Sequence, residues 1–262
     1  MFLNANGLTF HVDVQGVPKG PALVLLHSLG TTLHLWDPQM EVLGQCSRVI
    51  RLDLRGHGLS DAPAGPYTME ELASDVLAVL DRLDVGQAVV AGVSIGGMIA
   101  QCLWALAPHR VRALILVDSS LATALPAVWR ERAEAVRRHG IAPIVRDVAG
   151  RWVTPAFADS AAAHGLRTML LRTPADGFAG CSGAIAGADM TPHATVEGPP
   201  VLVIVGDQDR STPPAMAESL RAAWGGRLEV LAGAAHIPNF EKPAELARVM
   251  RGGVEAQGPW RP

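Results

Sequence analysis

Apolar residues recur in short runs along the chain, and these runs predict the strands of a buried sheet. Residues 8–14 alternate between apolar and polar side chains, which is typical of an antiparallel strand at a sheet edge. The nearly continuous apolar runs at 22–27 and 111–117 are typical of strands that are covered on both faces. Further strands are expected at residues 48–54, 88–92, 201–205 and 227–231.

Helical patterns separate these strands. The sequence from Thr68 to Glu71 has the spacing of a capping box, in which each of the two side chains bonds the backbone of the other. Residues 98–107 repeat apolar side chains at helical spacing, and Thr212 with Pro213 predicts another helix start. Strands that alternate with helices in this way predict a doubly wound, mostly parallel sheet.

The alternation stops between residues 121 and 199, where no buried strand is expected. Helical patterns are found instead at residues 127–139, 142–151 and 160–172. We expect residues 121–199 to form a helical cap over the carboxyl ends of the strands, the edge at which open α/β sheets bind ligands. Residues 1–120 and 200–262 would then form the core, with the tail from residue 252 onward as a loose end.

Composition and charge exclude several classes of protein. The chain has 262 residues, of which 49% are hydrophobic, which excludes disorder, and its net charge of −3 argues against nucleic acid or an anionic membrane as a partner. Cys46, Cys102 and Cys181 lack the spacing of a metal site, so we expect free thiols and neither metal nor cofactor. With no signal peptide and no membrane-spanning run in the sequence, we expect a cytoplasmic protein; its oligomeric state stays open.

A glycine-rich motif between a predicted strand and a predicted helix carries the candidate chemistry. Gly92-Val-Ser94-Ile-Gly96 matches the Gly-x-Ser-x-Gly nucleophile elbow. A strand that turns at once into a helix exposes the serine hydroxyl above the sheet, and the small glycines let the neighbouring backbone approach. The same five residues could form a simple glycine-rich turn, but the flanking strand and helix favour Ser94 as a nucleophile.

A serine nucleophile needs a base that is oriented by an acid. In this kind of fold the acid and the histidine follow the serine in that order. Asp207 and Asp209 follow the strand at 201–205, and His236 follows the last strand. We expect His236 to be the base and Asp209 its acid, with Asp207 as the alternative that would serve the turn.

The tetrahedral intermediate of such a reaction needs two hydrogen-bond donors for its oxyanion. We expect the backbone N–H of Ile95 to be one donor and that of Leu29 the other, with Ser28 as the competing position. The segment from residue 53 to residue 60 (Asp-Leu-Arg-Gly-His-Gly-Leu-Ser) is expected to be a tight structural connection rather than catalytic. Met98 and Trp104 are expected in the core.

These residues together resemble the α/β-hydrolase fold family, in which the sheet carries a helical cap inserted after its sixth strand. Within that family, the chain is most similar to the 3-oxoadipate enol-lactonases. The shared motifs are Ser28-Leu-Gly-Thr31, Leu35-Trp-Asp37, Arg55-Gly-His-Gly-Leu-Ser-Asp61, Gly92-Val-Ser-Ile-Gly-Gly-Met98, Arg151-Trp152, Thr154-Pro-Ala-Phe157, Thr212-Pro-Pro214 and Ala235-His236. The resemblance implies a Ser94, Asp209 and His236 triad, and a cofactor-free hydrolase of a small lactone or ester in the β-ketoadipate pathway of aromatic-compound catabolism.

Two departures from this pattern bear on the substrate. His27 stands where the lactonases commonly have asparagine, and no lysine or arginine lies between Arg172 and Arg210. An acidic lactone under the cap needs a cationic partner, for which Arg130 and Arg132, beside Trp129, are the first candidates and another arginine elsewhere in the chain is the alternative. The alternative functions are those of a general esterase, a carbon–carbon hydrolase, and an acyl-transfer or elimination enzyme. A ligand-binding receptor is disfavoured because the triad is complete.

Overall fold

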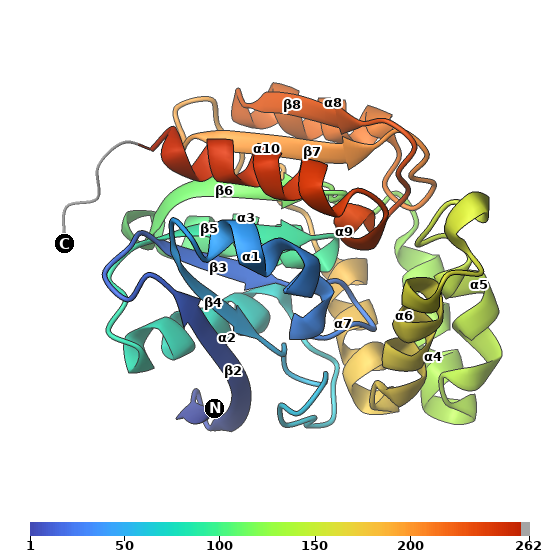
Figure 1. Cartoon of the computed structure of the whole chain (residues 1–262). Coiled ribbons are helices and arrows are strands. Elements are labelled where there is room, and N and C mark those ends of the chain that lie inside the picture. Colours follow the sequence, from blue (N-terminus) through green and yellow to red (C-terminus); the bar gives the residue numbers. More distant parts are fainter. Residues whose placement is uncertain (258–262) are drawn as a thin grey trace.

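The predicted strands lie side by side in one sheet of the computed structural model, which describes residues 1–257 (Figure 1). Within these residues the sheet has eight strands in the order β1-β2-β4-β3-β5-β6-β7-β8. Their bounds are β1 Phe2–Ala5, β2 Leu8–Gly16, β3 Ala22–Leu26, β4 Arg48–Leu52, β5 Ala88–Val93, β6 Val111–Val117, β7 Val201–Gly206 and β8 Arg227–Leu231. The short, largely exposed β1 was not predicted, because four residues give too little alternation to identify a strand.

Parallel pairing brings the carboxyl ends of the central strands to one edge of the sheet. β2 pairs antiparallel with both β1 and β4, whereas every pair from β4 to β8 is parallel. The loops after β3, β5, β7 and β8 therefore open at the same edge. These are the loops that hold Leu29, Ser94, Asp209 and His236.

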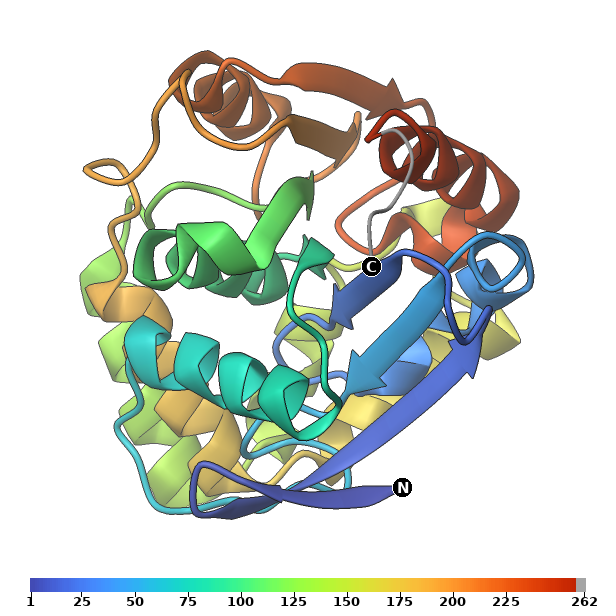
Figure 2. The same cartoon turned by 90° about the vertical axis from the view of Figure 1, so that its left-hand side faces the viewer.

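Helices cover both faces of the sheet. In Figure 2, α2, α3 and α8 lie on one face, and α1 and α10 lie on the other. The helices outside the expected cap are α1 Met40–Leu43, α2 Met69–Arg82, α3 Ile95–Leu106, α8 Pro214–Trp224, α9 Pro238–Glu241 and α10 Pro243–Glu255. The predicted capping box is confirmed, since the Glu71 N–H donates to Thr68 Oγ1 at 3.1 Å and the Thr68 N–H donates to Glu71 Oε2 at 2.8 Å.

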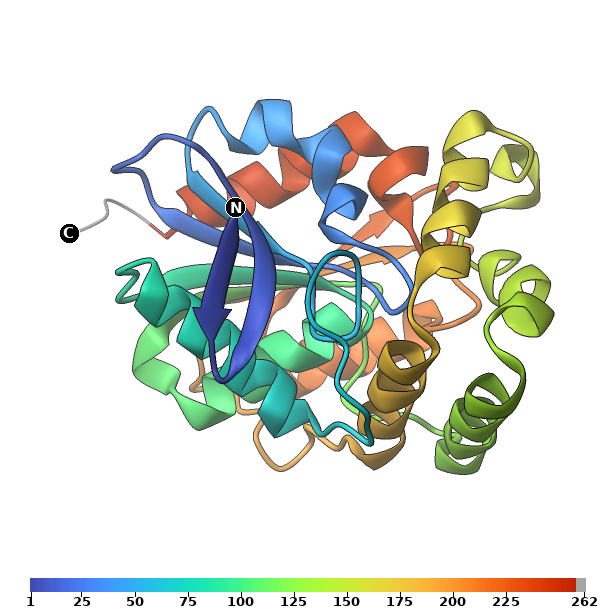
Figure 3. The same ribbon diagram turned by 90° about the horizontal axis from the view of Figure 1, so that it is seen from below.

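Four α-helices lie between β6 and β7, beside the carboxyl edge of the sheet (Figures 1 and 3). They are α4 Pro126–His139, α5 Val145–Ala149, α6 Ala161–Arg172 and α7 Ala175–Gly187. The ends of this segment meet, because Ala122 bridges Asp189 and the Met190 N–H donates to the Leu121 carbonyl at 2.8 Å. Short 3₁₀ helices occupy Leu33–Gln39, Pro108–Arg110, Ala142–Ile144 and Pro155–Phe157.

Two expectations for this segment are corrected. The single helix expected at 142–151 is a 3₁₀ turn followed by the short α5, which ends at Ala149 and is capped by Gly150. Helix α7 was not predicted, because its glycines, alanines and serine give no apolar stripe. Those small residues allow close packing: a Cβ at Gly177 would lie 1.9 Å from the Gly56 carbonyl oxygen.

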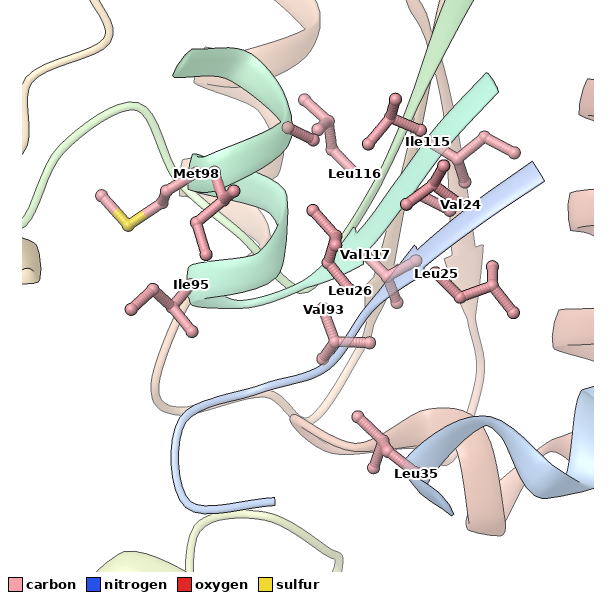
Figure 4. Packing of buried hydrophobic residues seen from close by; sticks show 14 of the residues in the cluster. Val24, Leu25, Leu26, Leu35, Val93, Ile95, Met98, Ile115, Leu116 and Val117 are labelled. Carbon is pink, nitrogen blue, oxygen red and sulfur yellow. The ribbon is translucent and has the colours of Figure 1, made fainter. Parts of the chain in front are cut away.

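The core lies between the sheet and its helices. Labelled side chains of β3 and β6 pack on both faces of the sheet, some toward α3 and others toward Leu35 (Figure 4), because successive side chains of a strand point to opposite faces. The tail is helical to Glu255, with Val254 buried, so the expected loose end is wrong for residues 252–255. Its last part, residues 258–262, lies outside the described residues. Within residues 1–257, no helix combines the length and the apolar character needed to cross a membrane.

Candidate active site

Ser94 occupies the sharp turn between β5 and α3. Its φ of 57° and ψ of −118° lie in a region that non-glycine residues rarely adopt. The turn is close-packed: a Cβ at Gly92 would lie 2.1 Å from the backbone of Gly96, and a Cβ at Gly96 would lie 2.5 Å from the Leu26 carbonyl. The Ser94 N–H donates to the Val117 carbonyl at 3.0 Å. Close packing explains why the motif has glycine at both positions. The hydrogen bond to β6 keeps Ser94 in its strained backbone conformation.

The first turn of α3 supplies an electropositive environment beside Ser94. Ile95 is the first residue of the helix, so its N–H has no partner within the helix. Helix N-termini favour negative charge near these free N–H groups. Ile95 is fully buried in the core, which fixes the direction of its backbone.

His236 and Asp209 form a buried pair in the loops after β8 and β7. His236 Nδ1 lies 2.8 Å from Asp209 Oδ2, and the two side chains are 5% and 0% exposed. Asp209 Oδ1 accepts the N–H of Ser211 at 2.7 Å, and its Oδ2 accepts the Thr212 hydroxyl at 2.6 Å. Thr212 does not cap α8, as the sequence suggested; Pro213 has that position, and the threonine holds the acid instead.

The environment of Asp209 keeps it ionised. Burial alone would raise its pKa, but the charge of His236 and the hydrogen bonds from His236, Thr212 and Ser211 lower the pKa of Asp209 well below its usual range. Asp207 has a different position. Its Oδ1 accepts the Gly233 N–H at 2.7 Å and so joins the loop after β7 to the loop after β8. The geometry thus joins His236 to Asp209 rather than to Asp207.

A tight turn after β3 presents the backbone of Leu29 to the site. The Thr31 N–H donates to the Ser28 carbonyl at 3.1 Å, which closes the turn, and Gly30 has a φ of 77°. No hydrogen bond within the described residues 1–257 engages the N–H of Ser28 or of Leu29. Both residues line the same cavity as Ser94, so both stay candidates for the second oxyanion donor.

Two buried histidines hold this turn. His57 Nε2 accepts the Gly30 N–H at 3.0 Å, and His27 Nε2 accepts the Leu54 N–H at 3.0 Å. Burial, and then the neighbouring His27, lower the pKa of His57 to about 3, so it remains neutral. The segment from residue 53 to residue 60 makes structural contacts, as expected, and its His57 also positions the turn after β3, which sequence reasoning missed.

Ser94 and His236 line one cavity of about 210 Å³ between the sheet edge and helices α4, α5 and α7. Its wall is mixed, with apolar side chains and three arginines. The lining residues are Ser28, Leu29, Ser94, Thr123, Ala124, Leu125, Val128, Trp129, Arg132, Val148, Arg151, Trp152, Phe178, Arg210, Ser211, Thr212, Met216 and His236. A smaller cavity of about 50 Å³ adjoins it at Ser94 and is bordered by Met98, which is therefore both buried and part of the site.

The arginines make this cavity electropositive. The Arg132 guanidinium lies 4.8 Å from the ring centroid of Trp129, and burial and the nearby Arg151 lower the pKa of Arg132. Arg151 donates to Asp147 at 2.8 Å, and Arg210 donates to the Gly150 carbonyl at 3.0 Å. Three cations and one acidic partner favour an anionic ligand group.

Arg130 does not line this cavity, which corrects the sequence expectation. It is exposed and borders a separate hollow with Glu134 and Arg137. Residues two apart on a helix do not share a face, whereas Trp129 and Arg132, three apart, do. Arg151 and Arg210 were not among the predicted substrate-binding residues. Arg210 follows Asp209 directly at the carboxyl end of a strand, and that position was the signal for it.

Glu241 connects the loop of His236 to the segment before α6. Its Oε1 accepts the N–H and the hydroxyl of Thr154 at 2.8 and 2.6 Å, and its Oε2 accepts the Ala235 N–H at 2.8 Å. The Ile237 N–H also donates to the Trp152 carbonyl at 2.8 Å. The position of the histidine is therefore coupled to the wall of the cavity. Residues 1–257 contain no cluster of histidine, cysteine or acidic side chains suited to a metal ion.

Comparison with known proteins agrees with this architecture. The family model for the alpha/beta hydrolase fold matches residues 21–243. The chain is 36% identical over 244 residues to 3-oxoadipate enol-lactonase 2 of Acinetobacter baylyi, covering 92% of this chain and 91% of that protein. It matches the crystal structure of the enol-lactonase from Burkholderia xenovorans LB400 with a TM-score of 0.94 and 33% identity, over 97% of this chain and 100% of that one. A thermophilic esterase from Thermogutta terrifontis matches with a TM-score of 0.92 and 26% identity over 99% of both chains. The expected fold is confirmed.

Proposed function

Because this chain belongs to the alpha/beta hydrolase fold family, we propose that it is a serine hydrolase that opens a small enol-lactone, 3-oxoadipate enol-lactone or a close relative. Ser94 is the nucleophile, His236 the base and Asp209 the acid that orients it. The observation that carries the proposal is the 2.8 Å contact between His236 Nδ1 and Asp209 Oδ2, at the cavity that Ser94 also lines.

The first step forms an acyl-enzyme. Ser94 Oγ attacks the lactone carbonyl while His236 Nε2 takes the hydroxyl proton, and the ionised Asp209 stabilises the imidazolium that results. The oxyanion of the tetrahedral intermediate is held by the N–H of Ile95 and that of Leu29 in the turn after β3. Because His57 fixes the turn, the Leu29 N–H needs no reorganisation during the reaction.

The following steps complete the acyl-enzyme and then release the product. Collapse of the intermediate breaks the ring C–O bond, and the enol oxygen receives the proton from His236. In a lactone the leaving group stays attached to the acyl chain, so both ends of the opened molecule remain in the cavity. Water, activated by His236, then attacks the acyl carbon and regenerates Ser94, as in other serine hydrolases.

The cavity arginines define the class of substrate within this proposal. A substrate carboxylate would be bound by Arg132, with Arg151 and Arg210 adding positive charge on the same wall. Residues 121–199 act as the cap that covers the acyl-enzyme and excludes water. The chemistry uses only side chains and backbone groups of the chain, and the partner is a small molecule. We place the reaction in the cytoplasm, where the three free cysteines stay reduced.

A direct assay tests the substrate. The purified protein is given 3-oxoadipate enol-lactone and, separately, a neutral ester of similar size, and both hydrolysis rates are followed. We expect the acidic lactone to have the higher kcat/KM. Faster cleavage of the neutral ester would favour a general esterase, which the apolar part of the cavity around Val128, Trp152 and Phe178 would also suit.

A further inference from the structure

Asp118 is a buried acid that the proposed mechanism leaves unused. It follows β6 directly, is 1% exposed, and has a positive φ of 43°, which is rare for a residue with a side chain. Its backbone N–H donates to the Ile204 carbonyl of β7 at 2.9 Å. The residue is thus held at the carboxyl edge of the sheet, beside the loop that carries Asp209.

The two carboxyl oxygens of Asp118 have different environments. Oδ1 accepts the Gly206 N–H at 2.9 Å, in the turn where the Asp209 N–H donates to the Gly206 carbonyl at 3.2 Å. Oδ2 is buried, and no N–H or O–H group of the described residues reaches it. A buried carboxylate oxygen without a donor is costly. A proton on Oδ2 removes that cost, provided that an acceptor lies beside it.

The charges around Asp118 favour that proton. Burial, and then the Asp209 carboxylate beside it, raise the pKa of Asp118 well above its usual range, and Glu241 adds a further negative charge. Two carboxylates that share a buried site cannot both ionise easily. Asp209 is the one that stays charged, because it bonds His236, Ser211 and Thr212.

We infer that Asp118 is held protonated and donates a hydrogen bond from Oδ2 to the Asp209 carboxylate, as a positioning residue behind the triad. The inference rests on the proposed function in that it gives Asp118 a task in catalysis. A neutral donor behind Asp209 fixes the acid without adding a second negative charge near His236. It also draws electron density away from the Asp209 oxygen that faces the histidine. The attraction between Asp209 and the imidazolium is therefore weaker.

The pH dependence of kcat/KM separates a neutral from a charged Asp118. D118N keeps a neutral side chain that can donate to Asp209 and accept the Gly206 N–H. We expect its kcat/KM to stay within about threefold of wild type, with the low-pH limb unmoved. If Asp118 is ionised instead, D118N removes a negative charge, and the low-pH limb moves to lower pH. That shift would overturn the inference.

D118A tests the donated hydrogen bond. Without the donor, Asp209 holds the protonated histidine more tightly, so the low-pH limb should move upward by about half a unit or more. The kcat/KM at neutral pH should fall about tenfold, since a hydrogen bond to a charged group is lost. A pH profile equal to that of wild type would contradict the role. The cavity arginines Arg132, Arg151 and Arg210 are present in every variant and do not alter the comparison.

An infrared measurement does not depend on catalysis. At neutral pH the wild-type protein should show the carbonyl stretch of a protonated carboxyl group. The band should be missing in D118N and present in D207N, a matched control in which an acid of the neighbouring loop is removed. If the wild type lacks the band, Asp118 is not protonated. If the band is present while S94A hydrolyses ester as fast as wild type, the proposed function fails and the protonation of Asp118 stands.

Discussion

The two walls of the cavity are built differently. At the sheet edge, Asp209 accepts hydrogen bonds from the loop that carries it, and Leu29 lies in a turn that is held by a buried histidine. On the wall formed by residues 121–199, Arg132 is held by the face of Trp129 and by an ion pair of 3.8 Å with Asp147, which is 58% exposed. The first wall is fixed by backbone and buried bonds, and the second by long side chains near solvent.

In the proposed function, this difference gives the catalytic chemistry to the sheet edge and the substrate specificity to the wall of residues 121–199. Catalytic groups need positions that are accurate to a fraction of an ångström, and rigid strand ends provide them. Exposed ion pairs contribute little to stability and are screened by salt. Arginines on the helical wall can therefore change with little cost to folding, whereas changes at the sheet edge affect the mechanism itself.

The largest effect should come from the sheet edge. S94A removes the proposed nucleophile and should lower kcat by about 10⁴-fold or more, as in other serine hydrolases. Because alanine is smaller than serine, the fold should be unchanged by circular dichroism. A kcat within about tenfold of wild type would show that Ser94 is not the nucleophile.

The two aspartates of the loop after β7 provide the next test. In the proposed mechanism D209N removes the charge that stabilises the imidazolium, so it should lower kcat by roughly 10⁴-fold. D207N keeps an amide oxygen that can accept the Gly233 N–H, and it loses only a negative charge on an exposed turn, so it should cost less than about tenfold. Steady-state kinetics of both variants decide the matter, and the reverse order would move the acid to Asp207.

Arg132 tests the specificity of the other wall. R132A should raise KM for an acidic lactone about ten- to a hundredfold, since a charge-assisted bond contributes roughly 1.5–3 kcal/mol. KM for a neutral ester of similar size should hardly change. R130A, two residues away on the same helix but outside the cavity, is the matched control. If R132A affects both substrates equally, the arginine does not recognise a carboxylate.

The smallest expected effect concerns the junction between the two walls. E241Q weakens three hydrogen bonds to Thr154 and Ala235, which should destabilise the fold by about 1–2 kcal/mol and lower kcat several-fold. Thermal unfolding and kcat are measured on the same preparation. T154V removes only the hydroxyl bond and should have a smaller effect on both. A loss of stability in E241Q without any loss of kcat would limit Glu241 to a structural role.

Local patterns predicted the regular parts of this structure. The nucleophile elbow is readable because two glycines and a serine between a strand and a helix have few other uses. The capping box at Thr68 and Glu71 is readable because its two bonds join residues three apart. Helix α7 was missed, because small residues that pack against a neighbour give no periodic signal until that neighbour is known.

The amino-acid sequence by itself determined the order of the strands from β2 to β8 and of the helices α2, α3, α4, α6 and α8, the turn at Ser94, and the loops in which Asp209 and His236 lie. These depend on interactions between residues that are near one another in the chain, and on the rule that parallel strands end at one edge. Only the tertiary structure decided that Arg132, Arg151 and Arg210 share a cavity, and that Asp118 accepts the Gly206 N–H in the turn that leads to Asp209. Burial and charge at those positions arise from segments far apart in the chain, and no local pattern of residues records them.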